Sequence, residues 1–72
     1  MGNSKMQQHN WNTTVIYKLR SATGLTQAEF CEKYHISIYA LQSWEQGLRK
    51  PSETVIYMLK RLIMIDFGKT IN

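Results

Sequence analysis

Signals that start and stop helices follow one another closely in residues 26–52. Thr26 opens a capping box, because Glu29 stands three residues further on. Ser37 can cap another helix, and Gly47 offers it a stop before the only proline of the chain enforces a break. Helices bounded in this way are short. We predict them at about residues 26–34, 37–46 and 52–66.

The rest of the chain adds one more helix and a polar N-terminal segment. We expect the first helix to start near Asn12 or Thr13, either of which can cap it, and to stop at Gly24. Residues 1–11 show no periodicity and are interpreted as a flexible arm, which leaves residues 12–72 as one domain. No strand pattern is convincing. The predicted fold class is all-α, a compact bundle of four or five short helices.

Composition narrows the class of function. A chain of 72 residues forms one domain at most, and its net charge of +4 suits a polyanionic partner such as DNA or RNA. The single Cys31 cannot form an internal disulfide, which favours a reducing cytoplasmic compartment. No zinc-ligand spacing, enzyme motif, signal peptide or membrane-length apolar run is visible. We therefore expect no metal, no cofactor and no enzymatic activity.

Residues 52–66 carry two apolar stripes. Ile56, Leu59 and Ile63 recur on one side of the expected helix, and Val55 begins the second stripe. A surface helix needs only one stripe to close a core, so the second can pair two copies of the chain. The alternative is a better-filled monomer core. The expected dimer interface comprises Met58, Leu62, Ile65 and Phe67.

The two central helices have the lengths and the short connection of a helix-turn-helix. Such helices cross steeply, and we expect Ala28 and Ala40 to supply the small side chains where they touch. Leu41 and Trp44 would bury one face of the second helix. Its opposite face would then be free to enter the major groove of DNA.

The stretch "GLTQAEFCEKYHISIYALQSWEQGLRKP" resembles the helix-turn-helix of the Xre/Cro/phage-repressor family, over about residues 20–51. Its "WEQG" and the proline that follows look most like small antitoxins of type II toxin–antitoxin operons and related mobile-element regulators. His35 departs from the pattern, because the family usually has glycine at this turn, where the backbone is left-handed. The family pattern is met by Leu25, Thr26, Gln27, Phe30, Ile36, Ser37, Leu41, Trp44, Glu45, Gly47 and Pro51.

The resemblance implies roles for individual residues. Gln42 can pair with adenine through its side-chain amide, and two cations after Gly47 are natural ligands for phosphate. An arginine of the first helix often pairs with the buried acid in this family, which assigns Arg20 and Glu45 to a structural ion pair. Base contacts are expected from Ile38, Tyr39, Gln42 and Ser43. Phosphate contacts are expected from Gln27, Ser37, Arg49 and Lys50.

The same resemblance implies a lambda-repressor-like fold and a sequence-specific repressor. We expect it to bind palindromic double-stranded DNA as a homodimer and to regulate its own operon. It would act in the bacterial cytoplasm, either as a protein associated with the nucleoid or as one encoded by a phage. Three alternatives stay open: an antitoxin that also neutralises a cognate toxin, a regulator of phage or anti-CRISPR operons, and a scaffold that no longer binds DNA.

Overall fold

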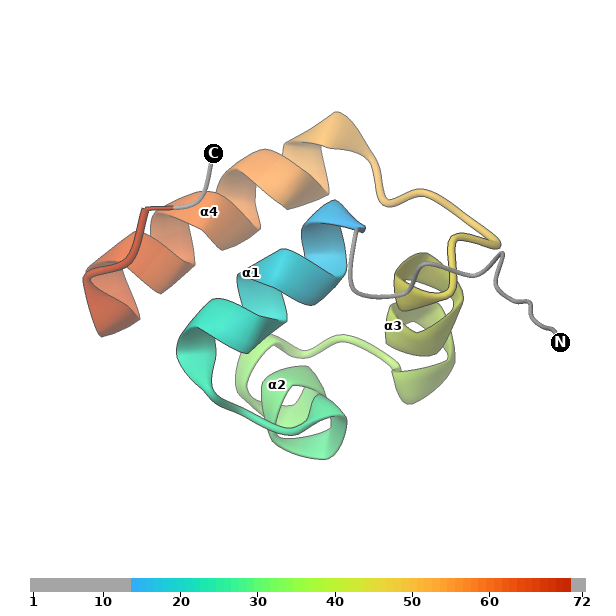
Figure 1. Ribbon diagram of the computed structural model, residues 1–72, viewed down its shortest axis with the longest axis horizontal. Coiled ribbons are helices and arrows are strands. Elements are labelled where there is room, and N and C mark those ends of the chain that lie inside the picture. The colour runs from blue at the N-terminus through green and yellow to red at the C-terminus, as the bar shows by residue number, and fades with distance from the viewer. Residues whose placement is uncertain (1–13, 71–72) are drawn as a thin grey trace, which may run out of the picture.

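The computed structural model describes residues 14–70, and all regular structure in that range is helical. The predicted all-α bundle is confirmed, with four helices (Figure 1). The predicted arm at residues 1–11 lies outside the described residues, as do Asn12 and Thr13. The expectation that one of these two caps the first helix was wrong, because its cap is Thr14, whose hydroxyl accepts from the Tyr17 N–H. The helices are α1 (Val15–Thr23), α2 (Gln27–Tyr34), α3 (Ile38–Glu45) and α4 (Glu53–Phe67).

A hydroxyl side chain caps the N-terminus of every helix. At α2 the expected capping box is complete: the Glu29 N–H donates to Thr26 Oγ1 at 3.1 Å, and the Thr26 N–H donates to Glu29 Oε1 at 2.9 Å. These contacts satisfy amide groups that have no partner within the helix. Each helix therefore begins where a short local signal places it. The four caps are Thr14, Thr26, Ser37 and Ser52.

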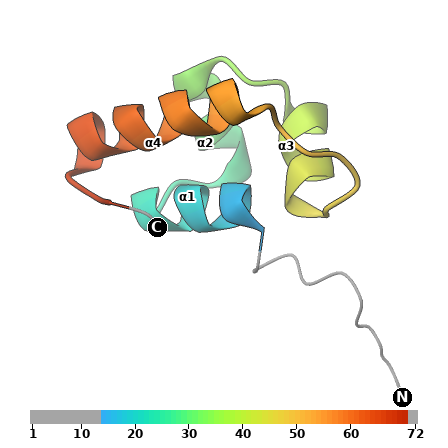
Figure 2. The same cartoon turned by 90° about the horizontal axis from the view of Figure 1, so that it is seen from above.

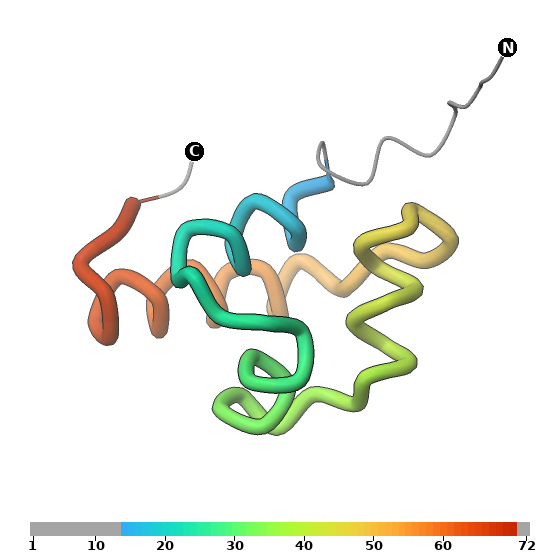
Figure 3. Tube along the Cα trace, turned by 60° about the horizontal axis from the view of Figure 1, so that its bottom comes forward, coloured from blue at the N-terminus to red at the C-terminus, as the bar shows by residue number. Residues whose placement is uncertain are grey.

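Left-handed residues end three of the helices. Gly24 ends α1 with φ 75°, and Gly68 ends α4 with φ 68°, so α4 runs one residue beyond the predicted bound, to Phe67. At the end of α2 the left-handed residue is His35, with φ 58°, and its N–H donates to the Cys31 carbonyl. This is the histidine that stands in place of the family's glycine. Figure 3 follows the chain through this turn into α3.

The core lies where the four helices meet. α1 packs against both α3 and α4, and α2 packs against α3 (Figure 2). Ala28 is exposed, so the expectation that it lies at the contact between α2 and α3 was wrong, while Ala40 is half-buried. Polar side chains instead link the start of α2, at Gln27, to the middle and the end of α3, at Gln42 and Glu45. The buried apolar residues are Ile16, Leu19, Phe30, Cys31, Leu41, Leu59 and Ile63.

Candidate nucleic-acid interface

The outer face of α3 carries polar and aromatic side chains. Leu41 and Glu45 are buried on the inner side, which leaves Tyr39, Gln42 and Ser43 on the outer one. Tyr39 is 80% exposed, the most open of the large apolar side chains in the described residues. The outer face of α3 is therefore at least partly exposed, and a major groove is wide enough to admit a single helix of this kind.

Ile38, Gln42 and Ser43 are all half-buried, and among the residues expected to contact bases only Ile38 packs against the apolar core. Only the part of the Ile38 side chain that stays exposed is available to touch a thymine methyl group. The other part of this side chain contributes to the apolar core.

An ion pair anchors α3 to α1. Glu45 is 1% exposed, and Arg20 binds it with two hydrogen bonds, Nε to Oε2 at 2.6 Å and Nη2 to Oε1 at 3.0 Å. Arg20 Nη1 also donates to the Leu25 carbonyl at 3.0 Å. The hydrogen bonds to Glu45 raise the pKa of the Arg20 guanidinium, which stays charged. A fork of this kind fixes both position and direction of the helix that bears the acid.

The ion pair continues outward through two glutamines. Gln27 Nε2 donates to Glu45 Oε1 at 3.0 Å, and Gln42 Nε2 donates to Gln27 Oε1 at 3.4 Å. The result is a chain Arg20–Glu45–Gln27–Gln42 that runs from the interior to the outer face of α3. Gln42 keeps its amide oxygen and its second N–H, the pair of groups that contacts adenine.

Sequence reasoning gave Gln27 and Gln42 separate roles and missed the link between them. One signal was available: Gln42 and Glu45 are three residues apart, so their side chains are neighbours on the surface of a helix. The Thr26 cap already placed Gln27 at the first residue of α2, but its position beside Glu45 and Gln42 of α3 shows only in the folded chain. Its amide lies between the buried acid and the outer face.

The loop after α3 holds two exposed cations, Arg49 and Lys50. The backbone N–H groups of Leu48 and Arg49 both donate to the Ser43 carbonyl, at 2.9 and 3.3 Å. These bonds fold the loop back onto the end of α3. Ser37 lies at the other end of that helix, where its hydroxyl caps the Ala40 N–H at 3.1 Å. Groups suited to phosphate therefore flank both ends of α3.

The residues expected at a dimer interface divide into two groups. Met58, Leu62 and Ile65 are exposed by 54%, 37% and 71%. Phe67 is half-buried, packs against the core, and has Lys33 Nζ at 5.7 Å from its ring centre. Only the first three form an open apolar strip.

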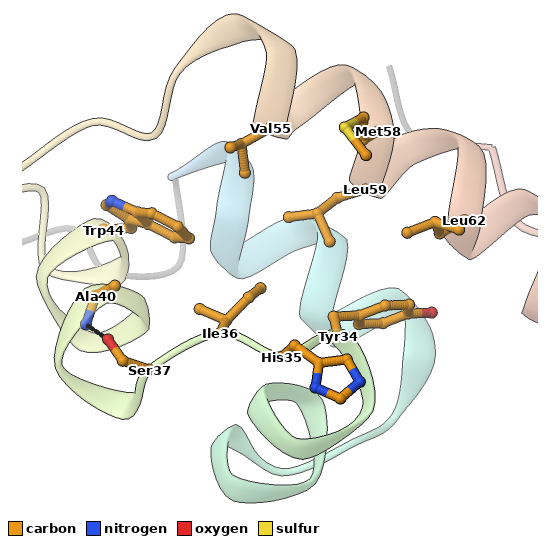
Figure 4. Close-up of a pocket in the computed structure, with 10 residues that line it drawn as sticks. All are labelled: Tyr34, His35, Ile36, Ser37, Ala40, Trp44, Val55, Met58, Leu59 and Leu62. Carbon is orange, nitrogen blue, oxygen red and sulfur yellow. Dashed lines mark hydrogen bonds between the residues drawn. The ribbon is translucent and has the colours of Figure 1, made fainter.

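Part of this strip borders an apolar groove of about 390 Å³ between α4 and the turn after α2 (Figure 4). Met58 and Leu62 lie on one side of the groove, and Ile36 and Trp44 lie on the other. Beside it, the Tyr34 hydroxyl donates to Asp66 Oδ2 at 2.8 Å and ties α2 to α4. Burial, helped by this hydrogen bond, raises the pKa of Tyr34 to about 12.

Residues 14–70 bring together no group of three or more His, Cys, Asp or Glu side chains that could hold a metal ion. None of their helices is both long enough and apolar enough to cross a membrane.

Short capped helices, a tight turn and an exposed second helix define a DNA-binding helix-turn-helix domain. A family profile described as helix-turn-helix matches residues 16–63, which is more than half of the chain. The protein belongs to this family, in its Cro/C1-type, Xre-like form, and is a DNA-binding transcriptional regulator. No curated protein and no solved structure matches the chain.

Proposed function

We propose that the protein is a sequence-specific repressor that binds an inverted repeat in double-stranded DNA as a homodimer and regulates its own operon. The bacterial cytoplasm is its proposed site of action, on host or phage DNA. The observation that carries the proposal is the Arg20–Glu45–Gln27–Gln42 chain. This chain ends on the Gln42 amide at the outer face of α3, where it can contact a base, and a scaffold that reads no DNA would not need such a group there.

The outer face of α3 reads bases. Gln42 contacts adenine through its free amide groups, and Tyr39 and Ser43 contact bases beside it. Ile38 contributes the exposed part of its side chain. These contacts supply sequence preference.

Phosphate contacts set the position of the domain on the duplex. The Ser37 hydroxyl accepts from Ala40 and keeps its own proton to donate to a phosphate oxygen. Gln27 has a second amide N–H for the same purpose, and Arg49 and Lys50 add charge on the far side of α3. Contacts of this type release counterions, so binding weakens steeply with salt.

Pairing of two domains supplies the length of site that one helix cannot read. The proposed interface is the open strip of Met58, Leu62 and Ile65, with Phe67 at its edge. Two-fold pairing places the half-sites about 34 Å apart or a multiple of that distance. A dimer bound over a promoter excludes polymerase and so represses transcription.

Selection of bound duplexes from a random DNA pool tests the proposal. We expect an enriched inverted repeat. Gln42→Ala should relax preference at one position of each half-site, by about 1–3 kcal/mol of discrimination. The matched control Arg49→Gln should weaken binding to all sequences alike and leave the preference unchanged. A pool without any enriched motif would overturn the proposal.

Sedimentation of two variants tests the pairing. Ile65→Lys places a charge in the proposed interface and should yield a monomer. Tyr57→Lys changes a side chain of similar exposure, 62% against 71%, outside the strip, and should leave the dimer intact. If the two variants had the same oligomeric state, the strip would not be part of the dimer interface.

The apolar groove beside α4 also supports a second candidate, an antitoxin that covers a toxin protein. An apolar surface of this kind is typical of a protein-binding site. A neighbouring gene that encodes a small toxin, with a product that co-purifies with this chain, would favour that role. Neighbouring phage or anti-CRISPR genes would instead favour a phage regulator.

A further inference from the structure

A second apolar hollow, of about 330 Å³, lies at the start of α1. Val15 on α1, Trp44 on α3 and Ile56 on α4 form its walls, and Pro51 closes it from the loop before α4. The start of α1 and this loop lie next to each other (Figure 2). Within the described residues, no side chain fills the hollow, although its walls are ones that water solvates poorly.

Thr14, the first residue that the structure describes, is among the residues that line this hollow. Residues 1–13 precede Thr14, and their only aromatic residue is Trp11. Three residues of chain span at most about 10 Å, so the indole of Trp11 stays within reach of the rim. Its flat apolar body matches the walls, and its N–H can remain at the water-exposed edge.

We propose that the hollow is the docking site of Trp11, which fastens the N-terminal segment to the loop between α3 and α4. A tethered side chain has a high local concentration at the site, which a side chain from a second copy lacks. DNA phosphate is a poor occupant, because Lys50 is the only cation among otherwise uncharged lining residues. The segment offers Met6 as another apolar candidate, five residues further from the rim.

Docking has a consequence for the loop. Gly47 and Lys50 line the hollow, and Arg49 lies between them in the sequence. A docked indole holds this loop in one arrangement and so places its two cations for phosphate. This consequence rests on the proposed DNA-binding function, whereas the docking itself does not.

Nuclear magnetic resonance of the full chain without DNA tests the docking. We expect nuclear Overhauser contacts from the Trp11 indole protons to the methyl groups of Val15 and Ile56. Val15→Lys puts a charged chain in the hollow at a position that is 48% exposed, so it should fold normally and lose the contact to Ile56. Val15→Ala, which leaves the hollow open, should keep that contact.

Three results would overturn the docking. They are the absence of contacts in the unaltered chain, contacts to Ile56 that survive Val15→Lys, and contacts that arise only between differently labelled copies. Trp11→Ala should also lower the unfolding midpoint by about 4–8 °C, the shift that loss of one modest apolar contact gives in a small domain. Met6→Ala is the control, and an equal shift there would count against Trp11.

A DNA titration separates this inference from the proposed function. If docking orders the loop, Trp11→Ala weakens binding to the enriched duplex severalfold and Met6→Ala does not. Equal binding by the two variants would overturn the effect on the loop. An unaltered chain that binds no DNA would refute the proposed function, while the contacts of Trp11 would still decide the docking.

Discussion

Replacement of Glu45 by alanine tests whether the ion pair is a structural element. The change leaves Arg20 without its charged partner and removes the acceptor of the Gln27 amide. Removal of one partner from a buried pair costs about 3–5 kcal/mol. Because 16% of the Arg20 side chain is exposed, water can solvate part of the freed guanidinium, which places the expected loss near the lower bound, at about 3 kcal/mol.

Such a loss is large for a domain of this size, whose whole stability is of the order of 5 kcal/mol. At about 4–8 °C per kcal/mol, the unfolding midpoint should fall by about 12–24 °C. Thermal unfolding followed by circular dichroism measures it. The double variant Arg20→Met with Glu45→Leu should recover much of the loss, because an apolar pair leaves no charge unpaired.

Two results would refute this reasoning. One is a Glu45→Ala variant that unfolds at the original midpoint. The other is a variant that stays fully stable and changes its preferred operator, since that would place Glu45 in DNA recognition. Glu29→Ala is a useful control, because it removes an acid that is exposed and held only by the capping box.

Three further predictions concern the turn, the loop and pH. His35→Gly should stabilise the domain by about 0.5–1 kcal/mol in urea unfolding, because glycine adopts the left-handed backbone without strain; a loss of stability would contradict this. Arg49→Gln and Lys50→Gln should each lower the slope of log binding constant against log salt by about 0.9, and an unchanged slope would remove that residue from the phosphate contacts. The pKa of Tyr34 rises from its ordinary 10 to about 12 on folding, so the unfolded chain ionises first and stability should fall as pH rises from about 10 to 12. Tyr34→Phe should lose this part of the pH dependence, and an unaltered alkaline profile would refute its assignment to Tyr34.

The parts of the fold that sequence predicted well depend on neighbours in the chain. The Thr26 capping box acts over three residues, and Gly24 acts at the residue where the helix stops. Interactions between residues close in the sequence determine such features, so the features can be predicted without knowledge of the tertiary fold. The left-handed backbone at His35 was predicted differently, from the resemblance to a family that usually has glycine at that turn.

The features that sequence missed depend on how helices cross. An alanine suits a close contact, yet Ala28 lies on the exposed side of α2, because the direction in which α2 meets α3 is set by the core. Phe67 was expected at a dimer surface, and the rotation of α4 packs part of its side chain against the core, so that only the remainder is exposed at the edge of the strip. A stripe of apolar residues in the sequence shows that a helix has an apolar face. It does not show which edge of that face is covered by the core and which stays exposed.

The chain of polar contacts also bears on how such a regulator can evolve. Its innermost link, Arg20 to Glu45, is 2.6 Å long, and its outermost, Gln42 to Gln27, is 3.4 Å, at the limit of a hydrogen bond. Replacement of Gln42 breaks only the weak outer link and leaves Gln27 on the buried acid. Under the proposed role of Gln42 in reading bases, Gln27 separates the buried ion pair from the residue that reads DNA. A substitution at Gln42 would then change the preferred operator at little cost in stability.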